Sequence, residues 1–600
     1  MVTLTHSSDS DSHASPAGRR GDNESRARPE GWLFAAALIS GFVHDIGLAR
    51  GQTVDYFSTP WVVSPLPPAT NTTSPQANPS GNRSPRTNSN LYSHALAQSE
   101  PEAPPWTVTG NVGIDEIATD NVAETEHDRI ADIESLASAG ATATADSTRL
   151  SGILSATGVY RRDIKDTGLD GFSGYGYANG SAAIVPGLFN FSLHGLMDDI
   201  SREGEGLQNV LVQTPQETQT YSVSGFPYLT NRIGNLGSNE LRYQIGQVWF
   251  VNNTGVIGTP GLNIGPITSS TDQNVREDLK MAGTMLPRLT SDVSLSGMEN
   301  DSGELGSGDY TNLNGELINE YEVTRYASAI AGAGYERLHD NDFPTIDGES
   351  PVWDIGTRLR PDPDSYVLLT YGHHYLKSDF AGELEWQLSD LTNVYAAYTD
   401  SITNSQQSII GNTEASQVGP GGADSGVSFS QSTLIGTLDD QTLSAGGAGT
   451  GSPLGVPLTD INNALPLQNG LFRDKSFRAT ARTLLDGDSL SLTAYYLQST
   501  QLTAVGLSSS EVGQVDTTEA GTLIWNRPLS PDLTGQLSAG YSHLNLDNAD
   551  LYNTSVGLTQ VLSESLSIVL RYDLIYREAH PNAGGYLQNA VTIGLHKTFE

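Results

Sequence analysis

Apolar and polar residues alternate along most of the chain after residue 106, in segments of about ten residues. Successive side chains of a β-strand point to opposite faces, so each segment predicts a strand with one apolar and one polar face. The last segment, residues 586–599, has an apolar face of Leu587, Val591, Ile593, Leu595 and Phe599, interrupted by Asn589 and Lys597. Its other face is small or polar and comprises Gln588, Ala590, Thr592, Gly594, His596 and Thr598. This division predicts a wall strand of an outer-membrane barrel, apolar outside and polar inside.

A second segment, residues 566–577, indicates which side chains face the lumen. Its even positions from Leu566 to Tyr576 are apolar or aromatic, whereas Arg571, Asp573 and Arg577 share the other face. A charge on the lipid face costs up to a few kcal/mol near the membrane midplane, so these three residues are predicted to line the lumen. The same argument directs Glu383 and Glu385 inward, opposite Leu384, Trp386 and Leu388.

Short turns and longer polar connections follow one another along the chain. A soluble antiparallel sandwich would also alternate, but it would not normally keep this rhythm over most of its length. The rhythm predicts an all-β fold, a transmembrane antiparallel outer-membrane β-barrel of about 22 strands (roughly 18 to 24) with periplasmic termini. The turn signals lie near residues 145–148, 187–190, 237–240, 287–288, 325–326, 361–364, 389–392, 486–488, 530–532 and 563–565, and the longer stretches include 118–132, 203–218, 252–275, 339–351, 404–470 and 503–515.

The first 105 residues have a different texture from the rest. Arg26 and Arg28 precede an apolar run at 32–43 and small residues at 47–49, which predicts a signal peptide over residues 1–49 with an extended n-region. An N-terminal anchor or a later start codon is the alternative. Residues 50–105 are rich in Pro, Ser and Asn and predict a disordered periplasmic linker. The barrel is expected over residues 106–600, with 404–470 as a long loop or a pore insertion.

Composition narrows the partners. The 600 residues carry 69 acidic and 31 basic side chains, a formal charge of −38, and no cysteine. Nucleic acid and anionic lipid surfaces both require a cationic partner, so no nucleic-acid binding is expected. The charge favours neutral or cationic solutes or divalent cations, and the absence of cysteine excludes disulfides and thiolate metal sites.

Asp340, Asp342, Asp347 and Glu349 cluster in a predicted outer loop. Oxygen ligands of this kind suit calcium or magnesium, so the loop is a candidate divalent-cation site. The ligand spacing of a calcium-binding helix-loop-helix is absent, and a solvated acidic loop is the simpler interpretation.

Other motifs give no catalytic site. His373 and His374 are adjacent on a predicted strand and face opposite sides, so they cannot bind one metal together. The glycines at 446–451 are not followed by lysine as in a phosphate-binding loop. No G-x-S-x-G elbow is present, so neither an enzyme nor a cofactor is expected.

Five short stretches carry a family resemblance: residues 119–122 (TDNV), 331–336 (AGAGYE), 353–356 (WDIG) followed by Arg360 and Pro361, 369–372 (LTYG) and 398–403 (YTDSIT). In their order and spacing the chain resembles the outer-membrane barrel family associated with the PEP-CTERM/exosortase exopolysaccharide system, related to the β-barrel porin 2 group. The resemblance covers roughly residues 106–600. It implies an outer-membrane location and a link to exopolysaccharide or surface-protein export, and it supplies no catalytic or binding residues.

The sequence therefore predicts a channel or porin-like protein of the bacterial outer membrane. A structural or scaffold protein with a plugged lumen is the alternative, and an outer-membrane hydrolase is less favoured. The expected partners are outer-membrane lipid, the barrel assembly machinery with Phe599 as its signal, and exopolysaccharide export components. The transported substrate is not indicated.

Overall fold

The computed structural model describes residues 106–599 with gaps, so the predicted signal peptide and linker lie outside the described residues. The gaps are 123–124, 128, 148, 166–169, 202–216, 235, 252–255, 258–262, 265–267, 283–285, 302–308, 341–347, 363–364, 376, 390, 416–469, 486, 504–512, 514, 546–548 and 579–584.

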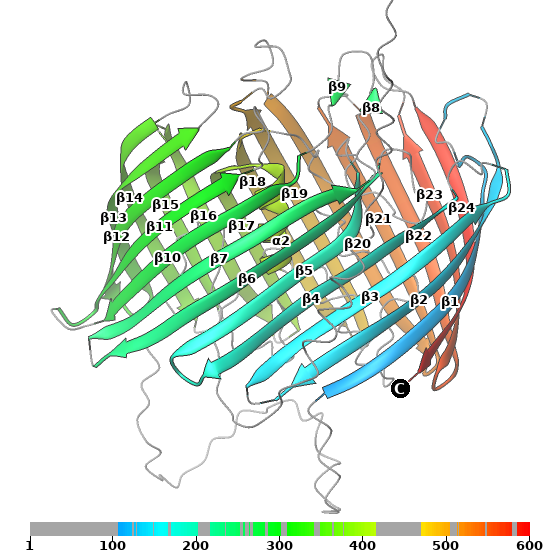
Figure 1. Cartoon of the computed structure of the whole chain (residues 1–600), viewed down its shortest axis with the longest axis horizontal. Helices are drawn as coiled ribbons and strands as arrows, with labels where there is room; N and C mark the ends of the chain where they lie inside the picture. The colour runs from blue at the N-terminus through cyan, green and yellow to red at the C-terminus, as the bar shows by residue number, and fades with distance from the viewer. Residues whose placement is uncertain are drawn as a thin grey trace, which may run out of the picture. The chain divides into compact units, whose positions relative to one another are not determined.

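The described chain forms a 22-stranded antiparallel sheet that closes on itself, because β1 pairs with β24 as well as with β2 (Figure 1). A separate two-residue hairpin, β8 (Val256–Ile257) with β9 (Asn263–Ile264), lies in the connection between β7 and β10. The wall strands are β1 (Trp106–Thr119), β2 (Asp132–Asp146), β3 (Leu150–Asp163), β4 (Gly171–Val185), β5 (Phe189–Ser201), β6 (Glu217–Ile233), β7 (Gly237–Val251), β10 (Ser270–Ala282), β11 (Leu289–Asp301), β12 (Tyr310–Thr324), β13 (Ala327–Asp340), β14 (Gly348–Asp362), β15 (Ser365–His374), β16 (Lys377–Ser389), β17 (Thr392–Thr403), β18 (Phe472–Leu485), β19 (Asp488–Gln501), β20 (Val515–Ser530), β21 (Leu533–Leu544), β22 (Ala549–Ser563), β23 (Leu566–Arg577) and β24 (Tyr586–Phe599).

The predicted 22-strand antiparallel barrel is confirmed. Neighbouring wall strands follow chain order, and ten hairpins are joined by short turns at one end, as when Arg325 and Tyr326 separate β12 from β13. One turn is displaced from its predicted place. The prediction put it at 237–240, but β7 already begins at Gly237, and the chain turns before it, where Gly234 has a φ of 54°. Glycine adopts this left-handed conformation without the cost that other residues meet.

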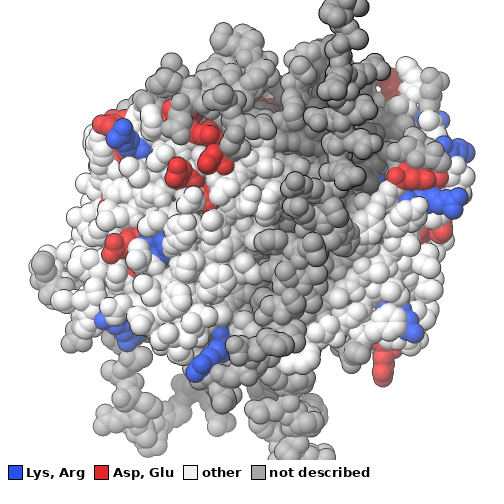
Figure 2. Space-filling model, in the orientation of Figure 1, with Lys and Arg blue, Asp and Glu red and all other residues white. Residues whose placement is uncertain are grey.

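The two faces of the wall differ in polarity. On β23, Leu570 is 48% exposed and its neighbour Arg571 is 7% exposed, and this alternation runs along the strand. Large exposed apolar residues share the outer face around the barrel, while the buried positions between them are mostly polar or charged. The outer wall is accordingly mostly white in Figure 2, with most of its charged side chains toward the upper and lower ends. The apolar surface of this fold is thus its outside.

Candidate functional site: a constricted polar lumen

Charged side chains line the interior of the wall. Among the buried side chains of the described residues, twelve are Asp or Glu and six are Arg. Arg571 and Asp573 lie on the inner face of β23, and the Arg571 Nε donates to the two carboxylate oxygens of Asp573 at 2.9 and 2.8 Å. Arg577 is partly buried on the same face. All three side chains therefore share the inner face of β23.

The inner faces of β15 to β19 carry a row of alternating tyrosines and charges. The Tyr366 hydroxyl donates a hydrogen bond to Glu383, which is buried on β16. Tyr395 on β17 lies close to Glu383 and to Arg478 on β18, and Tyr495 on β19 lies close to Arg478. We call these five residues the tyrosine row.

Glu385 on β16 is also predicted to face inward. It is partly buried and pairs in register with Tyr366 on β15 and with Tyr395 on β17. Glu383 and Glu385 therefore share the inner face of β16.

The outer end of β17 folds into the lumen. Ile402 and Leu471 are buried against Met298, Tyr310 and Leu338 on β11, β12 and β13. These three alternate with exposed outer-face residues of their strands, so the cluster lies inside the barrel. Because β17 is four strands away from β13 in the sheet order, this contact crosses part of the lumen.

The helix α2 (Ser405–Ala415) continues this inward path (Figure 1). Ile409 and Ile410 are buried against Leu196 on β5 and Val248 on β7. Both partners are buried. On β7, Tyr243 and Ile245 are exposed on the outer face, and Val248 lies on the opposite, inner face. We call residues Asn404–Ile410 the inner helix segment. It comprises the capping residue and the part of α2 whose side chains are described.

Polar contacts complete the docking of this segment. Gln406 Nε2 donates to the carbonyl oxygen of Thr268 at 2.8 Å, and the Tyr310 hydroxyl donates to Gln407. At the start of the helix, the Gln407 backbone N–H donates to the Asn404 side chain at 2.7 Å, which is an N-cap. Asn404 thus caps the first turn of the helix.

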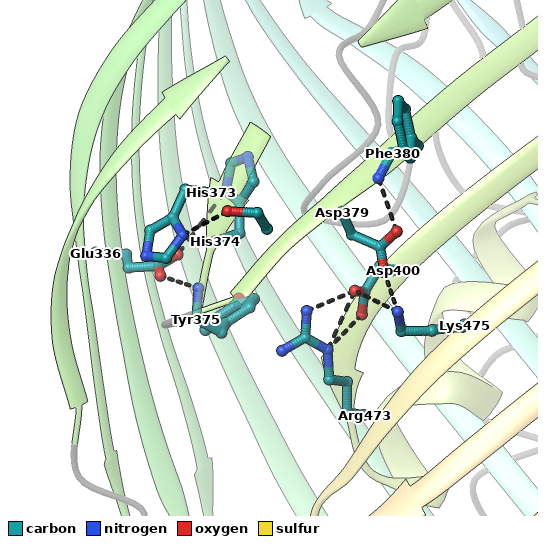
Figure 3. A network of polar contacts seen from close by, with 10 residues as sticks. Glu336, His373, His374, Tyr375, Asp379, Phe380, Asp400, Arg473 and Lys475 are labelled. Carbon is teal, nitrogen blue, oxygen red and sulfur yellow. Dashed lines mark hydrogen bonds and ion pairs between the residues drawn. The ribbon is translucent and has the colours of Figure 1, made fainter. Parts of the chain in front are cut away.

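Two polar clusters hold the wall beside this segment (Figure 3). In the first, Ser350 Oγ and the backbone N–H of Tyr375 both donate to Glu336 Oε1, and His374 Nε2 lies 3.0 Å from Asp354 Oδ1. Tyr375 has a φ of 48° in the short turn between β15 and β16. This cluster ties that turn to β13 and β14.

In the second cluster, the Arg473 Nε donates to Asp400 Oδ1 at 2.8 Å, and Lys475 forms ion pairs with Asp379 and Asp400 (Figure 3). These contacts join β16, β17 and β18 where β17 bends inward. Charge pairs therefore hold the base of the bend, and beyond it Ile409 and Ile410 dock the inner helix segment together with the polar contacts of Gln406 and Gln407.

The predicted histidine geometry is confirmed. His374 faces the interior cluster, whereas His373 stacks on the exposed ring of Trp353, with centroids 6.5 Å apart. The His373 and His374 rings therefore lie on opposite faces of the wall and share no site.

The candidate divalent-cation loop is only partly described. Asp340 is buried on the inner face of β13, whereas Glu349 is exposed on the outer face of β14, where its carboxylate lies 3.3 Å from Arg337 Nε. These two residues do not share a site, because their strand positions point to opposite sides. Asp342 and Asp347 lie outside the described residues. In the described part of the chain, no group of three or more His, Cys, Asp or Glu is placed to hold a metal ion.

Phe599, the predicted assembly signal, is 46% exposed on the outer face and pairs in register with Gly110 across the β1–β24 seam. Inside the seam, His596 Nε2 lies 2.9 Å from Asp115 Oδ1. The C-terminal strand thus closes the barrel.

Residues 404–470 were expected to be a loop or a pore insertion. Their described part, 404–415 and Gly470, belongs to the inward path, and residues 416–469 lie outside the described chain. The helix itself was not predicted. The adjacent Ile409 and Ile410, within an otherwise polar stretch, were the sequence signal that could have indicated a buried contact there.

A closed antiparallel wall with an apolar outside and a polar inside satisfies every condition for crossing a lipid bilayer with strands, since each backbone group is paired within the wall. The chain is a transmembrane β-barrel of the outer-membrane type. Among the helices that the structure describes, none is long and apolar enough to cross a membrane.

No family model matches this sequence, and no curated protein matches it. The resemblance to the exosortase-associated family therefore stays a prediction.

Among solved structures, the chain is similar to the FrpB iron transporter of Neisseria meningitidis (F3-3 variant), with 9% identity over 82% of this chain and 81% of that chain and a TM-score of 0.42. It is also similar to the ferric-catecholate import receptor Fiu of E. coli K12, with 10% identity over 81% of each chain and a TM-score of 0.39. A third neighbour is OccK1 of Pseudomonas aeruginosa, with 8% identity over 82% and 99% of the chains and a TM-score of 0.29. At identities this low, the substrate named for each neighbour belongs to that neighbour alone.

Proposed function

We propose that this protein is an outer-membrane channel for small hydrophilic solutes, with a preference for cations. The observation that supports it is the polar inner face, in which buried carboxylates outnumber buried arginines by twelve to six among the described residues. Charged side chains in a narrow, water-filled passage act at close range on the ions that pass, and an excess of acidic groups favours cations.

Reversal potentials in planar bilayers separated by a KCl gradient test this proposal. The purified protein should conduct ions, and its reversal potential should have the sign expected for a membrane more permeable to K⁺ than to Cl⁻. The double variant Glu383→Gln/Glu385→Gln removes two inner-face charges and should shift the potential toward anion permeation, because lumen substitutions tune selectivity.

A matched control removes two charges from the other face. Glu277 on β10 and Glu299 on β11 are both exposed on the outside of the wall. The variant Glu277→Gln/Glu299→Gln should leave the reversal potential unchanged. Equal shifts in the inner and outer variants would contradict the proposed lumen, and an absence of conductance would favour a structural protein with a plugged lumen.

We propose exopolysaccharide passage as a second candidate function. The observation that favours it is the tyrosine row, since aromatic faces beside hydrogen-bonding side chains suit ligands with both apolar and polar groups, as sugars are. Neutral oligosaccharides added to the bilayer chamber should then interrupt the ion current, and Tyr366→Ala, at a partly exposed member of the row, should weaken that block. Current that is insensitive to oligosaccharides would leave ion and small-solute passage as the function.

A further inference from the structure

The inner helix segment differs from the wall in the way it is attached. Each wall strand is held by backbone hydrogen bonds to two neighbours, whereas α2 belongs to no sheet. Among the side chains of α2 that the structure describes, Ile409 and Ile410 supply the apolar attachment, and each is 2% exposed. Gln406 and Gln407 add side-chain hydrogen bonds that water could equally provide. Elements with few buried apolar contacts are those that detach without global unfolding.

The base of the segment is held more firmly than its tip. Arg473 and Lys475 fix Asp400 on β17, and Ile402 is buried in the cluster with Tyr310 and Leu338. The strand ends at Thr403, and Asn404 already caps the helix. The helix therefore begins just beyond the part of β17 that the charge pairs hold, and Thr403 Oγ1 bridges the junction of Thr403 and Asn404 through its contacts with Gln407 and Ser408.

The wall is shaped to receive the helix. Gly246 lies on the inner face of β7, and a Cβ added there would come within 2.7 Å of Ile410 Cδ1 and 3.4 Å of both its γ carbons. The glycine thus provides the space into which Ile410 fits. This close approach places the helix against the wall of β5–β7 from a strand that lies well away from it in the sheet order.

We propose that the inner helix segment is a gate, whose docking on β5–β7 narrows the lumen and whose release widens it. This inference rests on the proposed channel function. It assigns a gating role to Ile409, Ile410 and Gly246, and a hinge to the junction of Thr403 and Asn404.

A cysteine pair can hold the gate shut. The chain has no native cysteine, so Gly246→Cys/Ile410→Cys introduces a single thiol pair, at two positions close enough for a disulfide. In planar bilayers the oxidised protein should have an open probability about tenfold lower than the same protein after reduction, since a covalent lock removes the undocked population. Thiol titration verifies that the disulfide has formed.

The matched control places a disulfide in the wall. Thr480 on β18 and Thr493 on β19 have hydroxyl oxygens 3.3 Å apart on the inner face, away from the residues that dock α2. Thr480→Cys/Thr493→Cys should conduct equally in both redox states. Equal conductance of the gate pair in both states, with its disulfide formed, would overturn the gate and leave the channel intact. No conductance in either state would overturn the channel itself.

A releasing variant tests the opposite direction. Ile409→Asn/Ile410→Asn removes the apolar attachment while retaining the helix cap, and it should raise the open probability of the channel. Retained heat-modifiable migration on gels shows that its barrel has folded. Conductance equal to that of the unmodified protein in a folded variant would contradict the proposal.

Discussion

Gly246 is a point at which the inner helix segment meets the wall. It lies on the inner face of β7, where Gln244 and Val248 on the same face are buried. Because it lacks a side chain, Ile410 of the inner helix segment reaches the wall at this point. A larger residue would occupy the same space.

We therefore expect Gly246→Leu to displace α2 and raise single-channel conductance. The new side chain would meet Ile410, the far end of which lies 2.7 Å from the added Cβ. The matched control is Gly557→Leu on the inner face of β22, where an added Cβ has only ordinary contacts of 3.9 Å or more. It adds the same volume to the lumen without touching α2, and it should lower conductance or leave it unchanged. An equal effect of both variants would contradict the specific contact.

At the residue scale, the sequence indicates which face of the wall a side chain occupies more readily than it indicates which side chains lie close together. Period-two alternation is a local property, so Arg571, Asp573 and Glu383 could be assigned to the inner face without knowing their neighbours. To group Asp340 with Glu349 correctly, one must know which face of its own strand each residue occupies. The spacing of acidic residues along the loop does not give this information. A one-residue difference in phase sends a side chain to the other face.

At the scale of elements, the barrel depends on one long-range pairing, that of β1 with β24. Its outer end is reinforced by Asp120, whose carboxylate accepts hydrogen bonds from the backbone N–H and the side-chain nitrogen of Asn589, each at 2.7 Å. Gln588 Nε2 also donates to the carbonyl oxygen of Asn121 at 3.0 Å. The seam therefore has side-chain bonds in addition to its ladder.

Asp120→Ala should destabilise the folded barrel by about 2 kcal/mol, because it removes hydrogen bonds to a charged acceptor. The temperature at which the folded band disappears on gels measures the change. Asp120→Asn keeps one oxygen acceptor for the backbone N–H of Asn589 and should lose only part of this stability. A full loss in the Asn variant, or none in the Ala variant, would show that these bonds do not support the seam.

Deletion of β24 from Tyr586 onward should prevent membrane insertion. The deletion leaves β1 and β23 without their shared partner, and an open edge in lipid carries unpaired backbone groups that cost several kcal/mol each. Fractionation of cells that express the truncated chain measures insertion, and degraded or aggregated protein is expected. Normal recovery in the outer membrane would contradict the closure by β24.

The hairpins were predictable and the inner helix segment was not, for a physical reason. A hairpin is encoded by adjacent strands and a short turn, such as Arg325–Tyr326. The docking of Ile410 on Gly246 joins residues from distant parts of the sequence, and nothing local in the polar stretch around α2 indicates its partner.

At the scale of the whole molecule, the number of strands followed from the rhythm of connections, because ten short turns require ten hairpins and the two ends add one strand each. Closure, the width of the passage and its acidic excess belong to the assembled wall. These properties combine inner-face residues from strands all around the barrel. Composition alone indicates only that the net charge is negative. The proposed channel and the proposed gate both depend on the assignment of the two faces.

Spin labels on four consecutive residues of β19 test that assignment most directly. Ser491 and Thr493 are buried on the inner face, and Leu492 and Ala494 are exposed on the outer face. Each is replaced in turn by cysteine in the cysteine-free chain, labelled, and measured in lipid bilayers for collision with oxygen, which concentrates in lipid, and with a water-soluble nickel complex. The account predicts high oxygen and low nickel collision rates at 492 and 494, and low oxygen collision rates at 491 and 493. The same values at all four positions, or the inverse pattern, would contradict it.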